Sequence, residues 1–218
     1  MQLAILTNTS QEGEVYSTQY GIAAPIAEIG VNGHTILVTA QAQSDPRATV
    51  RALKDLGATH LWLCESVAAL SPLLDIGDWL VPDDYIDGTR GQQYTYYDER
   101  AGGFVQQVPP FDPASRDALL TALQAVNPRP FKRAVYVCVS NTRLETPAEA
   151  LFWCRAGGHV AGRFLSPALM LGRELEMRVA ALVCVMRPGG ELGDAPLRFR
   201  AFHEVLAGAL TVLSDKKS

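Results

Sequence analysis

A regular alternation of two hydrophobic patterns constrains the fold more than any other feature of this sequence. Short apolar runs of strand length lie at residues 2–7, 35–40, 59–64, 133–139 and 179–186. Helical patterns separate most of them, near residues 46–56, 113–126, 147–156, 167–177 and 195–213. This order predicts an α/β fold with a mostly parallel sheet covered by helices. The 218 residues are enough for a single domain, over residues 1–218, whose core needs no covalent staple.

Four helix starts are marked by a capping residue that is followed by proline. The pairs are Asp45-Pro46, Asp112-Pro113, Thr146-Pro147 and Ser166-Pro167. The side-chain oxygen satisfies a free backbone N–H, and proline at the first helical position removes a donor that had no partner. Glu149 follows Thr146 by three residues, which predicts a capping box.

The overall charge argues against a polyanionic partner. The chain has 19 basic and 23 acidic residues, a formal net charge of −4, and no basic run. This excludes a nucleic-acid footprint and binding to an anionic membrane surface, so we expect a small-molecule ligand. The apolar runs are too short to cross a bilayer and the N-terminus has no signal-peptide pattern, which favours a cytoplasmic protein.

Cysteine and histidine spacing gives no sign of a metal site. The four cysteines are far apart, form no CxxC pair, and mostly lie in apolar runs, which favours buried thiols in a reducing compartment. The four histidines have no metal-ligand spacing, and His60 and His159 stand at strand starts, where a structural role is expected. A long segment before residue 113, rich in Gly, Asp, Tyr and Gln, predicts extra strands and a functional loop.

Four segments, in order along the chain, carry a resemblance to a known family. They are YGIAAPI at 20–26, ALKDLGATH at 52–60, DIGDWLVPDDYIDGT at 75–89, and the stretch 140–177 with NTRLETPAE, GGHVAG and RELEM. The segment at 75–89 is the most specific, because it is long and of mixed composition. On these residues the chain resembles the nucleoside phosphorylase family, in the branch of methylthioadenosine and purine nucleoside phosphorylases.

The resemblance implies a mixed, barrel-like β-sheet flanked by helices, assembled as a homotrimer with the active site near a subunit interface. It also implies a purine or 5′-modified nucleoside as ligand, phosphate as a co-substrate, and no other cofactor. Several positions that bind phosphate or purine in the family carry different residues here. The chain therefore resembles a divergent member, and fold and activity have to be considered separately.

The positions that bind phosphate in the family are altered. The glycine-rich turn after the first strand reads Thr7-Asn8-Thr9-Ser10, where Thr9 and Ser10 keep hydroxyls that can bind an anion, although a polar turn explains them equally well. The family's Arg-His-Gly is replaced by Ala40-Gln41-Ala42, so no cation remains there. Glu65 replaces a phosphate-binding hydroxyl, and a carboxylate about 4 Å from phosphate costs roughly 4 kcal/mol at an effective dielectric near 20.

Glu65 can be interpreted in two ways. As a catalytic group it would act as a general base on water, which converts a phosphorylase scaffold into an N-glycoside hydrolase. As a structural group it would cap a helix or form a salt bridge. The next residue, Ser66, begins the segment that corresponds to the family's small-residue loop and is a candidate substrate contact.

The base-binding positions fall just before the helix that starts after Thr146. Leu144 stands where the family stacks a phenylalanine on the purine, so it offers apolar contact without aromatic stacking. Glu145 corresponds to a base-reading glutamate of the oxopurine branch, and a solvated turn residue is the equal alternative. Arg143 is expected to line the same pocket.

Two further segments complete the candidate site. Gly162, Arg163 and Phe164 represent the family's ribose-holding segment, and Arg163 either binds an anion or extends to the surface. Arg187 replaces the aspartate that helps the base to leave; it can donate a hydrogen bond to N7 but is a poor proton donor. We assign Glu65 and Arg187 to catalysis, and this requires both to border one cavity.

Three functions agree with this pattern. The first is cleavage of the N-glycosidic bond of a purine or 5′-modified nucleoside by a glycosyltransferase of the nucleoside phosphorylase type. The second is hydrolysis of the same bond by a nucleosidase that uses water. The third is a pseudoenzyme that keeps the fold and binds a ligand, or assembles with an active paralogue, without chemistry.

Overall fold

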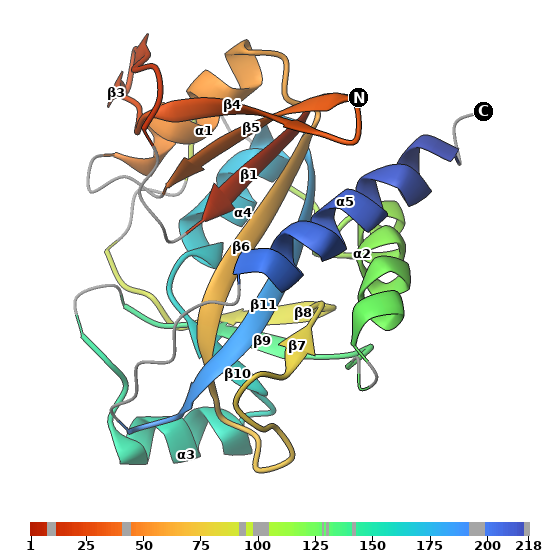
Figure 1. The fold of residues 1–218 in the computed structure, drawn as a ribbon. Helices are drawn as coiled ribbons and strands as arrows, with labels where there is room; N and C mark the ends of the chain where they lie inside the picture. The colour runs from red at the N-terminus through yellow and green to blue at the C-terminus, as the bar shows by residue number, and fades with distance from the viewer. Residues whose placement is uncertain are drawn as a thin grey trace. The chain divides into compact units, whose positions relative to one another are not determined.

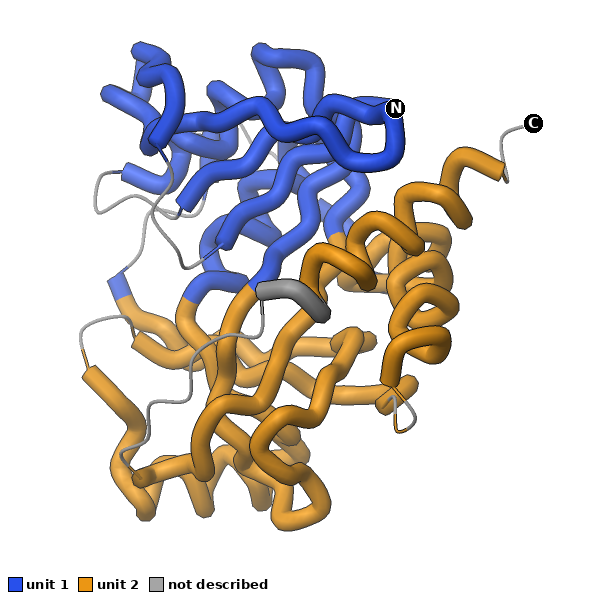
Figure 2. The backbone as a smooth tube through the Cα atoms, viewed as in Figure 1, with its two compact units in different colours: residues 1–64, 91–108, 164–179 blue, residues 65–90, 109–163, 180–218 orange. Residues whose placement is uncertain are grey.

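The computed structural model describes residues 1–7, 12–40, 45–91, 95–97, 105–127, 129, 131–140, 143–191 and 199–215, with the side chains of 199–201 left out. These residues form an α/β fold with a mixed sheet flanked by five helices (Figure 1), as predicted. The chain divides into two compact units, 1–64 with 91–108 and 164–179, and 65–90 with 109–163 and 180–218 (Figure 2). That residues 1–218 form one cooperative domain stays a prediction.

The first unit is built around a parallel strand whose residues are all buried. Strand β1 (Leu3–Thr7) pairs in parallel with β5 (His34–Ala40) on one side and with the start of β6 (His60–Ala69) on the other. A continuous apolar run is expected of a strand covered on both faces. Strand β4 (Ile26–Val31) pairs antiparallel with β5, and its exposed centre explains why the apolar pattern missed it.

Two helices of this unit test the predicted caps. Helix α1 (Pro46–Asp55) starts as expected, because Asp45 accepts from the backbone N–H of Arg47 at 2.9 Å. Helix α4 (Leu165–Glu174) begins before the predicted start at Ser166-Pro167. Ser166 lies inside it with φ −94° and ψ 133°, since a residue that precedes proline is pushed out of the helical region. A short hairpin of β2 (Ser17–Thr18) and β3 (Gly21–Ile22) completes the unit.

The second unit contains three adjacent parallel strands that decide where the site lies. Strand β9 (Val135–Cys138) stands between β8 (Asp84–Asp87) and β10 (Val160–Gly162) and is parallel to both. The far end of β6 pairs antiparallel with β10. Because β8, β9 and β10 run in the same direction, the segments that follow them lie at one edge of the sheet. This edge is where α/β proteins usually bind ligands.

The remaining elements of the second unit are two further strands of the sheet and three helices. Strand β11 (Arg178–Pro188), which starts in the first unit, pairs antiparallel with β7 (Trp79–Leu80). Helices α2 (Pro113–Val126) and α5 (Phe199–Asp215) lie side by side (Figure 1). Helix α3 (Pro147–Arg155) follows β9 along the chain.

The local sequence signals in the second unit are largely confirmed. Asp112 accepts from Ser115 N–H at 2.8 Å, and Thr146 and Glu149 form the predicted capping box. The segment before residue 113 contains β8 as an extra strand. All four cysteines are free thiols, and three of them are buried. Among the described residues, no helix combines the length and apolar character needed to cross a membrane.

Candidate functional site

A cavity of about 270 Å³ opens at the carboxyl ends of β8 and β9. Its lining comes from the residues after each strand and from one face of α3: Gly88, Arg90, Val139, Ser140, Arg143, Glu145, Glu149 and Trp153. The volume lies near the lower end of the roughly 300–1,000 Å³ of small-molecule sites. Arg143 and Glu145, two of the residues predicted to bind substrate, therefore line one cavity, which we call the strand-end cavity.

Glu145 is engaged by an arginine from a distant strand. Nη1 of Arg187 donates to Oε1 of Glu145 at 2.5 Å and Nη2 donates to Oε2 at 2.8 Å, and the backbone N–H of Gly190 donates to Oε1 at 3.1 Å. The Glu145 side chain is buried, and the Arg187 side chain is 11% exposed. Arg187 also donates to the carbonyl oxygens of Pro188 and Glu191, at 3.2 and 3.3 Å. The base-reading residue and the leaving-group residue of the sequence prediction thus form one ion pair.

The pair keeps Glu145 ionised despite its burial. Desolvation acts to raise the pKa of Glu145, but the hydrogen bonds from Arg187 and from the Gly190 amide outweigh it and lower the pKa below its usual value. The carboxylate therefore remains an acceptor at neutral pH.

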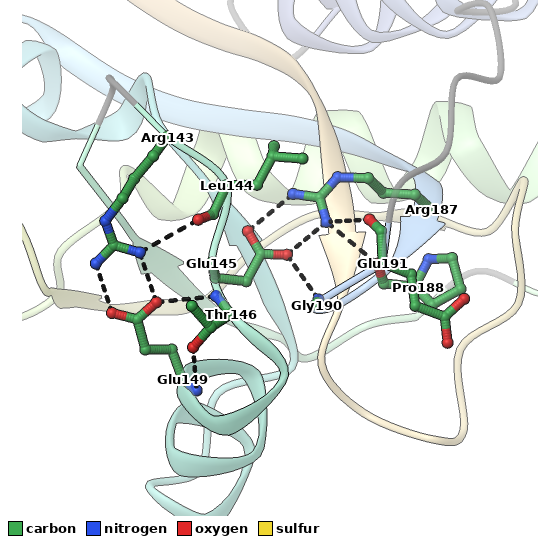
Figure 3. A network of polar contacts seen from close by, with 9 residues as sticks. All are labelled: Arg143, Leu144, Glu145, Thr146, Glu149, Arg187, Pro188, Gly190 and Glu191. Carbon is green, nitrogen blue, oxygen red and sulfur yellow. Dashed lines mark hydrogen bonds and ion pairs between the residues drawn. The ribbon is translucent and has the colours of Figure 1, made fainter.

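A second ion pair lies a few residues away on the exposed side of the same segment. Arg143 donates to both oxygens of Glu149 at 2.6 Å, while Glu149 also accepts from the backbone N–H of Thr146 at 2.9 Å. The Arg143 hydrogen bonds, followed by that of Thr146, lower the pKa of Glu149 to about 2. Figure 3 shows the two carboxylates turned toward different arginines, Glu145 toward Arg187 and Glu149 toward Arg143.

Glu65 belongs to a separate network inside the sheet. Its side chain is buried, and its Oε1 accepts from the backbone N–H of Arg163 at 2.7 Å. The hydroxyl of Tyr136, on β9, donates to Oε2. Gly162 packs against this carboxylate so closely that an added Cβ would lie 2.6 Å from Oε2. Two donors, one on each oxygen, hold the carboxylate in one orientation.

The structure does not place Glu65 and Arg187 in one network. Arg187 lines a second cavity of about 250 Å³ whose other lining residues are mostly apolar, from 69–76 and 185–189. Glu65 is not among the lining residues of this cavity or of the strand-end cavity. A common catalytic cavity for the two residues stays a prediction.

The other predicted site residues are distributed as follows. Leu144 is half-buried and does not line the strand-end cavity, and Ser66 is half-buried on β6. Gly162 is buried, Arg163 is half-buried, and Phe164 is half-buried at the start of α4 in the first unit. Thr9 and Ser10 lie outside the described residues, so their role in phosphate binding stays a prediction.

Several site residues were not found from the sequence. Tyr136 looked like part of an apolar strand, and only its pairing register brings its hydroxyl to Glu65. Trp153 and Arg90 line the strand-end cavity, and Arg90 makes no ion pair within the described part of the chain. The spacing of Glu149 and Trp153, four residues apart on one helix face, was the available signal for the cavity wall.

His60 and His159 have structural surroundings. Nδ1 of His159 accepts from the backbone N–H of Val135 at 3.1 Å, and Nδ1 of His60 lies 2.9 Å from the hydroxyl of Thr59. In the described ranges, no three His, Cys, Asp or Glu side chains are grouped as metal ligands would be.

Comparisons with known proteins agree on one family. The family model described as the phosphorylase superfamily matches residues 8–215. A probable S-methyl-5′-thioinosine phosphorylase of Methanothermobacter thermautotrophicus is 32% identical over 160 residues, which are 73% of this chain and 55% of that protein. An S-methyl-5′-thioadenosine phosphorylase of Pyrobaculum aerophilum is 33% identical over 169 residues, 77% of this chain and 60% of that protein. The chain spans about half to two thirds of the length of these relatives.

Solved structures show the same fold. The methylthioadenosine phosphorylase of Schistosoma mansoni in complex with adenine superposes with a TM-score of 0.85 at 19% identity, covering 98% of this chain and 92% of that one. The complex of that enzyme with tubercidin gives 0.83 at 20% identity, with the same coverage. The family resemblance predicted from the sequence is confirmed. The chain belongs to the phosphorylase superfamily, as a member of its nucleoside phosphorylase family.

Proposed function

We propose that this chain cleaves the N-glycosidic bond of a purine nucleoside or a 5′-modified nucleoside, with phosphate as the attacking co-substrate. The observation that carries the proposal is the strand-end cavity, which gathers Glu145, Arg143 and Arg90 where α/β folds bind ligands. Glu145 accepts hydrogen bonds from the base. Arg90, which pairs with no carboxylate among the described residues, attracts an anionic group.

Glu65 is the residue that we assign to charge stabilisation. Positive charge develops on the sugar as the N-glycosidic bond breaks, and a buried carboxylate of fixed orientation stabilises such charge more than a solvated one does. Tyr136 and the amide of Arg163 provide that orientation. Neither donor has to move during the reaction.

Hydrolysis is the second candidate, and Glu65 favours it. A buried carboxylate repels phosphate but accepts a proton from water, which would make a nucleosidase of the same scaffold. The third candidate is an inactive ligand-binding relative. The ion pair favours it, because Arg187 donates to Glu145 and is withdrawn from hydrogen bonding to a departing base.

The test is release of free base from adenosine, inosine and methylthioadenosine, with and without phosphate, followed by chromatography. Release that depends on phosphate supports the proposal, and release without phosphate identifies a hydrolase. If no free base is released from any of these substrates, both phosphorolysis and hydrolysis are refuted. If Glu65 is catalytic, Glu65→Gln lowers kcat about 100-fold or more. The matched control is Glu28→Gln, an exposed glutamate on β4.

Our proposal for the oligomeric state rests on the family resemblance. We propose that residues 1–218 fold cooperatively and form a homotrimer, in agreement with the family pattern. Light scattering coupled to size-exclusion chromatography measures the mass, and a monomer or dimer would refute the trimer. A cytoplasmic location stays a prediction.

A further inference from the structure

Trp153 is the one aromatic side chain that lines the strand-end cavity among the described residues. Trp153 lies on α3, on the same helix face as Glu149, and its side chain is half-buried. Five other wall residues come from the segments that follow β8 and β9, and their side chains are aliphatic, hydroxyl-bearing or charged. The indole is therefore the largest apolar group on the described wall of this cavity.

The indole is fixed before any ligand arrives. Its benzo edge touches the backbone of Gly88, where an added Cβ would lie 2.8 Å from Cζ2 of Trp153 and 2.9 Å from the carbonyl oxygen of Cys138. The ring also packs against a buried cluster that includes Val137, Val139 and Ala150, and its centroid lies 4.8 Å from that of Phe152. A ring held in this way loses little entropy when a ligand packs on it.

We propose that Trp153 is the base-stacking residue of this site, so that the ligand is a planar heteroaromatic ring packed on the indole beside Glu145. The inference rests on the proposed function. A base has a π-face and ring N–H groups, and these match the indole surface and the Glu145 carboxylate on the same wall. Leu144 does not line the cavity, so the stacking surface comes from α3 and not from the loop before it.

The three tryptophans allow a direct test. Trp62 and Trp79 are buried, and Trp153 alone lines the cavity. Titration of the full chain with adenosine or inosine should quench part of the indole emission in a saturable way, and ribose should not. Trp153→Phe should abolish the quenching while equilibrium dialysis still detects binding, because an aromatic ring remains.

Trp153→Leu should weaken nucleoside binding about fivefold to a hundredfold, the range that base stacking on an aromatic side chain supplies. The matched control is Leu151→Ala on the same helix, an exposed apolar residue outside the cavity wall, which should leave affinity unchanged. If Trp153→Leu does not fold, quenching in the wild type and its loss in Trp153→Phe decide the question.

The outcomes separate this inference from the proposed function. The role of Trp153 is overturned if the wild type binds nucleoside in dialysis without quenching of its indole emission. It is also overturned if a folded Trp153→Leu variant binds nucleoside with the affinity of the wild type. Either result leaves nucleoside binding intact. Absence of nucleoside binding by dialysis to the wild type overturns both.

Discussion

Two ion pairs flank Thr146 and differ in nearly everything except their geometry. Each joins a glutamate to both terminal nitrogens of an arginine. The side chains of Arg187 and Glu145 are 11% and 1% exposed, whereas those of Arg143 and Glu149 are 57% and 37% exposed. The first pair closes a contact across 42 positions of the chain, and the second spans six.

The difference shows that two ion pairs with the same hydrogen-bond geometry contribute unequally to the free energy of unfolding. Water solvates the exposed pair in both the folded and unfolded states, so little free energy depends on it. The buried pair has lost that solvation, and each charge relies on the other. We therefore expect Glu145 and Arg187 to be structural determinants of the site wall, and Arg143 to be replaceable.

The largest effect is expected for Glu145→Ala. It leaves the Arg187 guanidinium buried without its carboxylate and should lower the free energy of unfolding by about 3–5 kcal/mol. Urea unfolding followed by circular dichroism measures the loss. As a control, Glu145→Leu combined with Arg187→Met should recover most of the stability, because an apolar pair replaces an ionic one. A loss no larger than that of Arg143→Ala would contradict the comparison.

Thr146→Ala should have an intermediate effect. It removes the hydroxyl that accepts from the Glu149 amide at 3.2 Å and should cost about 1 kcal/mol of the free energy of unfolding. Thr146→Ser keeps the cap and is the matched control. Equal unfolding midpoints for the two variants would show that the cap contributes nothing.

The pH dependence sharpens the comparison further. Both carboxyl groups have folded pKa values below the unfolded value of about 4.3. Stability that depends on either ionised carboxylate is therefore present above about pH 4.3 and is lost as pH falls through the folded pKa, which is about 2 for Glu149. For Glu149 this contribution is small, because solvent screens the exposed pair. Carboxyl NMR titration of the native protein should give a midpoint near 2 for Glu149 and a lowered midpoint for Glu145. An ordinary midpoint for either would mean that its ion pair is absent in solution.

The smallest effect is expected for Arg143→Ala. The pair with Glu149 is exposed, so the unfolding midpoint should shift less than in Thr146→Ala, and 1 M salt should remove what shift there is. Arg143→Lys is the control for charge without the bidentate geometry. A shift that persists in 1 M salt would place Arg143 in the group of structural determinants.

The helix starts show how much of the fold could be predicted from local sequence. Asp45, Asp112 and Thr146 cap their helices as predicted, because the partner N–H is two or three residues away and no other part of the chain is needed. Ser166 was the exception, where the constraint imposed by the next proline placed an extended residue inside helix α4.

The candidate site was predicted less completely than the fold. Family resemblance predicted that Glu145 and Arg187 both contact the base, and the structure shows that they pair with each other. Tyr136 and Trp153 carried no signal of function, since each reads as an ordinary apolar residue of a strand or helix. Their contacts with Glu65 and Gly88 depend on strand order and register, which no single segment encodes.

The sequence alone determined the alternation of strands and helices, three of the four helix caps and the family, because these depend on patterns within a few residues or on long, specific motifs. Only the tertiary structure decided which charges neutralise one another and which aromatic ring meets the cavity. The physical reason is burial: a carboxylate such as Glu145 needs a donor once water is excluded, and that donor is Arg187 on strand β11, 42 residues along the chain.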